Sequence, residues 1–158
     1  MTKRFETSVI SRRMALGLVF GGGAALVASG FGIRPAAAGP LADAALAKIY
    51  GGKTVKEGGI KLDVPEIAEN GNTVPVGFSV DSPMTKDNYV KKVYIIADGN
   101  PTPNVASFEF TPMSGKASAS TRMRLAKTQN IIAVAEMSDG SMTKVSSQVK
   151  VTIGGCGG

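Results

Sequence analysis

The 158-residue chain contains no histidine, no tryptophan and a single cysteine. Without histidine it cannot build a Ser-His-Asp or Cys-His nucleophile arrangement, and it lacks a common metal ligand. One cysteine cannot form a disulfide within the chain or resolve a mixed disulfide, which argues against a stand-alone thiol oxidoreductase. No glycine-rich phosphate loop follows a predicted strand and opens a helix. We therefore expect neither an independent enzyme, nor a metal site, nor a cofactor.

Carboxylates are the remaining candidates for acid–base chemistry, and they are scattered. Asp63, Glu66 and Glu69 fall in a stretch whose composition indicates a polar connector. Their spacing does not indicate a paired general acid and general base. We assign them no catalytic role.

Residues 1–38 have the features of an export signal. Arg12-Arg13 precede an apolar, glycine-rich stretch over residues 15–32, and Ala36-Ala37-Ala38 provides a small-residue cleavage site before Gly39. The paired arginines and the weakly apolar stretch are typical of a twin-arginine signal. The alternative is an uncleaved membrane anchor, because about 18 apolar residues suffice to span a bilayer. The glycines and the cleavage site favour removal.

Most of the net positive charge of the chain belongs to this signal. The whole chain carries a net charge of +6, and residues 1–38 hold five Lys or Arg residues against one acidic residue, Glu6. Residues 39–158 therefore carry a net charge of only +2. Because no basic cluster with interleaved aromatic residues remains, we expect no nucleic-acid partner and, after signal cleavage, no membrane association.

The exported part predicts a mainly β domain over residues 39–153. A short helix is expected over residues 41–50, ended by Gly51-Gly52. Seven segments then show the alternation of apolar and polar residues that is typical of strands, and Asp139-Gly140 is a hairpin signal. This pattern indicates an immunoglobulin-like antiparallel β-sandwich of about seven strands. The expected strands cover residues 60–64, 74–80, 89–97, 106–110, 121–125, 130–137 and 142–153.

The only cysteine lies in the final segment, Gly154-Gly155-Cys156-Gly157-Gly158. Alternation along the last strand places Ile153 on its apolar face, so we expect Ile153 to be a core anchor and free chain to begin at Gly154. A glycine-rich segment has no side chains to pack, and Cys156 would reach about 10 Å beyond Ile153 on a flexible arm. A frayed tail without a role is the alternative, but a lone thiol is a liability in an exported protein.

An exported sandwich that ends in Val149 to Gly158 with the GGCGG motif resembles the SoxY family, the sulfur carriers of the bacterial periplasmic thiosulfate-oxidising (Sox) system. The resemblance implies that Cys156 is the attachment residue and that Gly154, Gly155, Gly157 and Gly158 form its carrier arm. It implies a periplasmic location and a heterodimer with a SoxZ-like subunit. It also implies three partner enzymes: a c-type haem enzyme that loads the thiol, a hydrolase that releases sulfate, and a sulfur dehydrogenase.

A second interpretation remains open from the residues alone. An exported structural or adhesive sandwich could dimerise through a disulfide between two copies of Cys156. A stable covalent dimer as the active species would distinguish this interpretation from a sulfur carrier.

Overall fold

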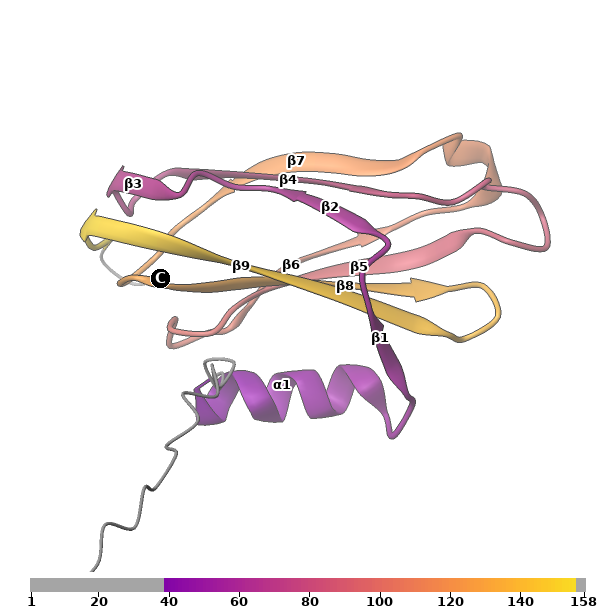
Figure 1. Ribbon diagram of the computed structural model, residues 1–158, viewed down its shortest axis with the longest axis horizontal. Helices are drawn as coiled ribbons and strands as arrows, with labels where there is room; N and C mark the ends of the chain where they lie inside the picture. Colours follow the sequence, from indigo (N-terminus) through magenta and orange to yellow (C-terminus); the bar gives the residue numbers. More distant parts are fainter. Residues whose placement is uncertain (1–38, 156–158) are drawn as a thin grey trace, which may run out of the picture. The chain divides into compact units, whose positions relative to one another are not determined.

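The structure is a computed structural model that describes residues 39–155. The predicted export signal (residues 1–38) and Cys156-Gly157-Gly158 lie outside the described residues. Figure 1 shows the elements between these limits. In chain order they are α1 (Pro40–Tyr50), β1 (Val55–Glu57), β2 (Ile60–Asp63), β3 (Ile67–Asn70), β4 (Val74–Val80), β5 (Val90–Ala97), β6 (Asn104–Glu109), the short 3-10 helix η1 (Pro112–Ser114), β7 (Ala117–Met123), β8 (Gln129–Met137) and β9 (Met142–Ile153).

The strands form two sheets that pack face to face. The larger sheet has the order β1-β9-β8-β5-β6, with β3 also paired to β9, and the smaller sheet has the order β2-β4-β7. In Figure 1 the smaller sheet is the upper layer and the larger sheet the lower layer. The prediction of a mainly β sandwich with a short N-terminal helix is therefore confirmed.

The core lies between the two sheets, where alternate residues of each strand meet. The smaller sheet contributes Val74, Val76, Phe78 and Val80 of β4, all buried. The ring of Phe78 packs edge-on against Phe108 of β6, with centroids 5.1 Å apart. Alternation in β4 follows the sheet period of two, so the sequence pattern identifies this strand and its inward face.

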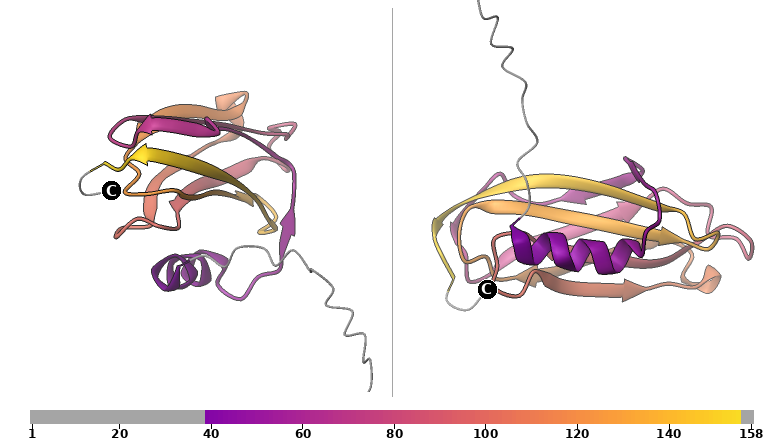
Figure 2. Two further views of the ribbon diagram at one scale, coloured as in Figure 1. Left: turned by 60° about the vertical axis from the view of Figure 1, so that its left-hand side comes forward. Right: turned by 90° about the horizontal axis from the view of Figure 1, so that it is seen from below.

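Helix α1 covers the outer face of the larger sheet, as the views in Figures 1 and 2 agree. Ala42 and Leu46 of the helix pack with Ile96 of β5 and with Ile132 and Val134 of β8. Both faces of β8 are thus buried, which explains its continuous apolar sequence. A proline in the first turn starts the helix, and Gly51, with φ of 54°, ends it.

The structure contains two short strands that the sequence pattern does not indicate, β1 and β3. Both run parallel to β9, β1 along its first residues and β3 along its last. Strand β1 has no buried residue and β3 buries only Ala68, so neither displays the alternation of apolar and polar residues that identifies β2. The stretch interpreted as a polar connector therefore contains β3, and the sandwich is not antiparallel throughout.

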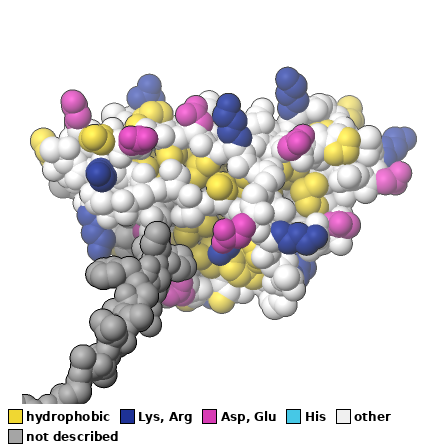
Figure 3. Space-filling model, in the orientation of Figure 1, with side chains coloured by type: hydrophobic (Ala, Val, Ile, Leu, Met, Phe, Trp, Pro, Cys, Tyr) yellow, Lys and Arg dark blue, Asp and Glu magenta, His cyan; other side chains and the backbone are white. Residues whose placement is uncertain are grey.

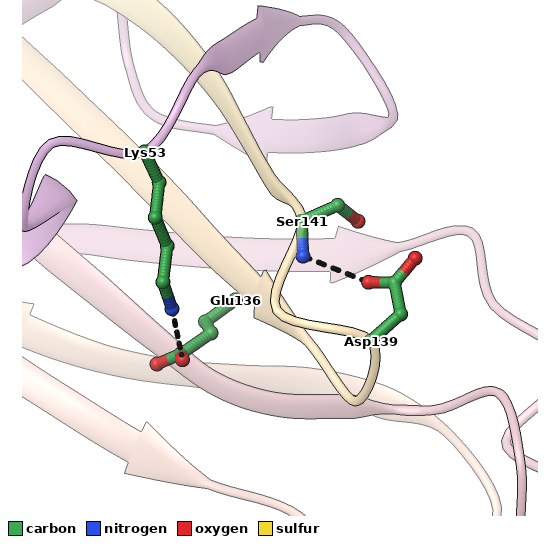
Figure 4. A network of polar contacts seen from close by, with 4 residues as sticks. All are labelled: Lys53, Glu136, Asp139 and Ser141. Carbon is green, nitrogen blue, oxygen red and sulfur yellow. Dashed lines mark hydrogen bonds and ion pairs between the residues drawn. The ribbon is translucent and has the colours of Figure 1, made fainter.

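The hairpin between β8 and β9 has the turn that Asp139-Gly140 indicates. Gly140 has φ of 82°, and its backbone N–H donates to the carbonyl of Met137 at 3.0 Å. The backbone N–H of Ser141 donates to the Asp139 carboxylate at 2.8 Å, as Figure 4 shows. Beside the turn, Lys53 forms an ion pair with Glu136 at 3.1 Å. Local residues thus close this end of β9.

Charged side chains of both signs are interspersed on the face shown in Figure 3. Arg122 and Arg124 face solvent, as their place in the predicted strand alternation indicates. Within residues 39–155, no helix is long and apolar enough to cross a bilayer.

Candidate functional site at the end of strand β9

The predicted attachment residue, Cys156, lies outside the described residues, but the two glycines before it are described. Strand β9 ends at Ile153, and Gly154 and Gly155 continue along the end of the sandwich. Gly155 is buried. The structure therefore defines the backbone up to Gly155, the residue that precedes Cys156.

Three backbone hydrogen bonds join this point to two distant segments. The N–H of Gly71 donates to the carbonyl of Ile153 at 2.7 Å, and the N–H of Gly155 donates to the carbonyl of Leu125 at 2.9 Å. The N–H of Leu125 donates to the carbonyl of Gly71 at 2.8 Å and completes the connection. We call Gly71, Leu125, Gly154 and Gly155 the glycine clasp.

The clasp requires glycine because backbone approaches backbone. A Cβ atom on Gly155 would lie 2.6 Å from the carbonyl oxygen of Gly71, and a Cβ on Gly71 would lie 2.7 Å from the nitrogen of Gly155 and closer still to the Leu125 carbonyl. A Cβ on Gly154 would overlap the carbonyl oxygen of Ala126. Atoms of real side chains do not approach so closely, so these glycines are needed for proximity. The expectation that free chain begins at Gly154 is wrong for Gly154 and Gly155.

The expectation that Ile153 is a core anchor is also wrong, because its side chain is 66% exposed. The last fully buried residue of β9 is Val149. Beyond it Val151 is partly buried against the core, and the strand pairs with β3, where Ile153 lies opposite Asn70. Main-chain pairing and the clasp therefore hold the end of β9, in place of an apolar side chain.

A loop between β7 and β8, which we call the seat loop (Arg124–Thr128), forms the surface under the clasp. Leu125 of this loop is fully buried, whereas Arg124 and Lys127 are exposed. The hydroxyl of Thr128 accepts a hydrogen bond from the N–H of Val151 at 2.9 Å and so joins the loop to β9. The seat loop therefore contacts the end of β9 and Gly155 through main-chain groups and the Thr128 hydroxyl, and it carries two exposed basic residues.

A shallow groove adjoins the seat loop. It is lined by the start of α1 from Gly39 to Leu41, by the turn Asp98–Pro101, and by Ala126 and Lys127. Gly39 is the residue at which the predicted cleavage would create a new amino terminus. The two predicted ends of the mature chain are therefore neighbours of the same loop.

The scattered carboxylates do not meet in the structure. Asp63 lies in β2, Glu69 lies in β3 and Glu66 precedes β3, and all three side chains are exposed. Within residues 39–155, no group of three or more acidic or cysteine side chains is placed to hold a metal ion. The expectation that these three carboxylates form no catalytic pair stays a prediction.

Sequence reasoning missed Gly71, Leu125 and the seat loop. The motif Asn70-Gly71-Asn72 signals a turn, and a turn is present, with the N–H of Asn72 donating to the Asn70 side chain at 2.9 Å. Nothing in that signal indicates that Gly71 is buried against residues from two other parts of the chain. Such contacts depend on the fold and have no local sequence pattern.

Comparisons with known proteins identify the family of the chain. The family model described as sulfur oxidation protein SoxY matches residues 46–156, and the match reaches Cys156. The solved structure of the sulfur carrier protein SoxY from Chlorobium limicola f thiosulfatophilum is 37% identical, with a TM-score of 0.60. It covers 70% of this chain and 96% of that chain.

Other similarities concern the fold alone. A superoxide reductase (neelaredoxin) from Ignicoccus hospitalis has 17% identity and a TM-score of 0.52, covering 60% of this chain and 80% of that chain. No curated protein sequence matches the chain. The family match over more than half of the sequence and the 37% identity decide the classification: the chain belongs to the SoxY family of sulfur oxidation proteins.

Proposed function

We propose that the protein is a covalent sulfur carrier whose attachment atom is the Sγ of Cys156. The observation that carries the proposal is the glycine clasp, which fixes the chain up to Gly155 and delivers the only cysteine of the sequence at the next residue. The family match ends at the same residue. A thiol that follows a fixed point, on a domain whose residues 39–155 contain no cluster of acidic or cysteine side chains placed to hold a metal ion, suits a carrier that other proteins act upon.

The proposed chemistry begins with thiosulfate. A c-type haem enzyme joins the outer sulfur of thiosulfate to Sγ, and the thiol proton and two electrons leave as the S–S bond forms. A hydrolase then adds water across the bond to the sulfonate group, releasing sulfate and leaving a persulfide on Cys156. Persulfidation of a cysteine is reversible, so the sulfur can be removed and the carrier used again. A sulfur dehydrogenase then oxidises the outer sulfur of the persulfide to a sulfonate, with the oxygens taken from water and the electrons and protons passed to the dehydrogenase. A second hydrolysis of the bond between Sγ and the sulfonate releases sulfate and restores the thiol.

The proposal places this chemistry in the periplasm. It is supported by the export features of residues 1–38, namely the paired arginines, the apolar stretch and the small-residue cleavage site. We propose that residues 1–38 are removed, that residues 39–153 form the carrier domain, and that residues 154–158 carry the cargo. Gly154 and Gly155 form the seated base of this arm, and Gly157 and Gly158 follow the thiol. A SoxZ-like subunit completes a heterodimer.

Intact mass spectrometry tests the proposal. Protein purified from thiosulfate-grown cells is expected to show sulfur adducts on Cys156, and the variant Cys156→Ser is expected to show none and to oxidise no thiosulfate. Unmodified thiol or a plain disulfide dimer in the wild type under these conditions would contradict the proposal.

A relocated thiol supplies the matched control. Ser141 is exposed in the hairpin at the other end of β9. The double variant Cys156→Ser, Ser141→Cys keeps one exposed thiol on the same domain, and we expect it to remain unloaded. Equal loading at both positions would show that any exposed thiol suffices and that the clasp has no part in the function.

A further inference from the structure

No strand pairs with the seat loop, so apart from the two main-chain hydrogen bonds of Leu125 in the clasp it is held by side chains. Its residues lie between the last residue of β7 and the first residue of β8, and the backbone there has no sheet partner over Arg124 to Thr128. Yet its position decides where Gly154 and Gly155 lie, since Leu125 and Ala126 form the surface beneath them. The residues that hold this loop therefore determine where Cys156 leaves the domain.

Asn100 takes the place of the missing strand. Its side-chain N–H donates to the carbonyl of Arg124 at 2.8 Å, and its side-chain oxygen accepts from the N–H of Ala126 at 3.1 Å. A neighbouring β-strand residue would bind these two backbone groups in the same way, with one donor and one acceptor. Asn100 lies in the turn after β5, so the contact joins two loops that are distant in sequence.

Gln129 holds Asn100 and the far side of the loop. Its side-chain N–H groups donate to the side-chain oxygen of Asn100 at 2.8 Å and to the carbonyl of Lys127 at 3.0 Å. Its side-chain oxygen accepts from the N–H of Gly99 at 2.7 Å. Each polar end of Gln129 is therefore used, and the loop is bound at Arg124, Ala126 and Lys127.

These two residues stand apart from the rest of the interior. Among residues 39–155, Asn100 and Gln129 are the buried polar side chains, with 5% and 4% of their surfaces exposed. Neither belongs to the apolar clusters between the sheets or under α1. Burying amides is unfavourable unless they are hydrogen-bonded, and here the bonds are directed at the one loop that supports the clasp.

We propose that Asn100 and Gln129 are positioning residues for the carrier arm: they fix the seat loop and thereby the point and direction from which Cys156 is presented. This inference rests on the proposed function for its biological meaning. Its physical content, the dependence of the clasp on two buried amides, does not depend on which cargo Cys156 carries.

Hydrogen exchange at the Gly155 amide, measured by NMR on the whole mature chain, tests the physical content. Asn100→Ala removes both bonds to the loop, and Val93→Ala is the control because it truncates a fully buried residue of the core between the sheets. With conditions adjusted to equal global stability, we expect protection of the Gly155 amide to fall about ten-fold further in Asn100→Ala than in the control. Equal protection in the two variants would overturn the proposal.

Gln129→Met is the second variant, since it keeps the length of the side chain and removes its hydrogen bonds. It is used in the same comparison and decides the proposal if Asn100→Ala does not fold. We also expect either variant to raise the KM for loading by the haem enzyme several-fold with little change in kcat. The Val93→Ala control is expected to leave KM unchanged.

The two proposals fail in different ways. If the wild type accepts no sulfur from thiosulfate, the proposed function falls, while the exchange comparison still decides the role of Asn100 and Gln129. If the wild type is loaded and neither the exchange nor the KM of the variants differs from the control, the positioning role alone is wrong.

Discussion

Strand β9 is held at its two ends by opposite means. At the hairpin, residues within five positions of one another close the turn, through backbone hydrogen bonds of Met137 with Gly140 and Ser141 and one bond from the Ser141 N–H to the Asp139 side chain (Figure 4). At the other end, the bonds join main-chain groups of Gly71, Leu125 and Gly155, which come from three distant parts of the sequence. Figure 1 shows the two ends on opposite sides of the sandwich.

The comparison shows that glycine serves different purposes at the two ends of β9. Gly140 is required for its backbone angle, because φ of 82° lies in the left-handed region. Gly71 and Gly155 are required for proximity, because a Cβ at either would meet another segment's backbone. A substitution at the hairpin strains one turn, whereas a substitution at the clasp separates segments that must stay together. We therefore expect a larger loss of stability at Gly71 than at the hairpin, and larger effects on the loading of Cys156 at both clasp glycines.

Gly71→Ala should have the largest effect on stability. Its Cβ would overlap the Leu125 carbonyl and the Gly155 nitrogen, and both belong to backbone that cannot move without breaking the clasp. Overpacking of this kind costs about 3 kcal/mol, which for a domain of this size lowers Tm by roughly 10 °C. Thermal unfolding followed by circular dichroism measures the change.

Gly77→Ala is the matched control for that variant. A Cβ there would make ordinary contacts, the nearest at 3.5 Å to the Cβ of Asp63, and the backbone is extended within β4. We expect this variant to be neutral or about 0.5 kcal/mol more stable. Similar losses of stability in Gly71→Ala and Gly77→Ala would show that the close backbone contacts of the clasp do not require glycine.

Gly155→Ala should have an intermediate effect. Its Cβ would lie 2.6 Å from the Gly71 carbonyl, but the residues after Ile153 can separate from the seat loop without disturbing the core. The cost is then limited to the bond between the Gly155 N–H and the Leu125 carbonyl, about 1 kcal/mol. Loading of Cys156 should slow because the residue before it is no longer held against the seat loop. Unchanged Tm together with unchanged loading would contradict the role of the clasp.

The difference between the two ends also explains what sequence reasoning achieved. The hairpin depends on Asp139-Gly140 and on neighbours a few positions away, so a local signal was sufficient to predict it. Strand β4 was predicted with its observed bounds because seven residues display the period of two. The sandwich follows from many such strands, each identified locally.

The clasp could not be predicted in the same way. Strands β1 and β3 are short and parallel to β9, and parallel pairing joins segments that are distant in sequence. Alternation predicted that Ile153 faces the core, but burial decreases along the end of β9 from Val149 to Val151, and the side chain of Ile153 is exposed. Cys156 was identified because composition isolates it, whereas Asn100 and Gln129 are ordinary loop and strand residues until the fold brings them together.

We expect Gly140→Ala to lower the free energy of unfolding by about 1 kcal/mol, because alanine is strained at φ of 82°. Its effect on function should be smaller than that of either clasp variant. Gly140→Asn should recover part of that loss, since asparagine tolerates the left-handed region. Neither variant should alter the loading of Cys156, because the hairpin lies at the far end of β9. A loading defect in Gly140→Ala would mean that the two ends of the strand are coupled.

The smallest effect is expected at Asp139, and it should depend on pH. Hydrogen bonds from the hydroxyl and the backbone N–H of Ser141 lower the pKa of the Asp139 carboxyl in the folded protein. In the unfolded chain this pKa is about 3.9. The carboxylate therefore stabilises the fold fully above that pH, and this stabilisation disappears as the pH falls through the lower, folded value.

The measurement is the difference in Tm between the wild type and Asp139→Ala over a range of pH. This difference should be small at neutral pH, since the side chain is exposed, and it should narrow as the solution becomes strongly acidic. Asp139→Asn keeps an oxygen that can accept from Ser141 and has no titrating group, so its own Tm should not follow this particular acid transition. If the difference in Tm between the wild type and Asp139→Ala became larger as the pH fell, the pKa of Asp139 would have to be raised by folding rather than lowered, and the prediction would be wrong. That result would also show that the hydrogen bonds from Ser141 to the Asp139 carboxylate do not stabilise the hairpin, and the clasp has no such side-chain contribution.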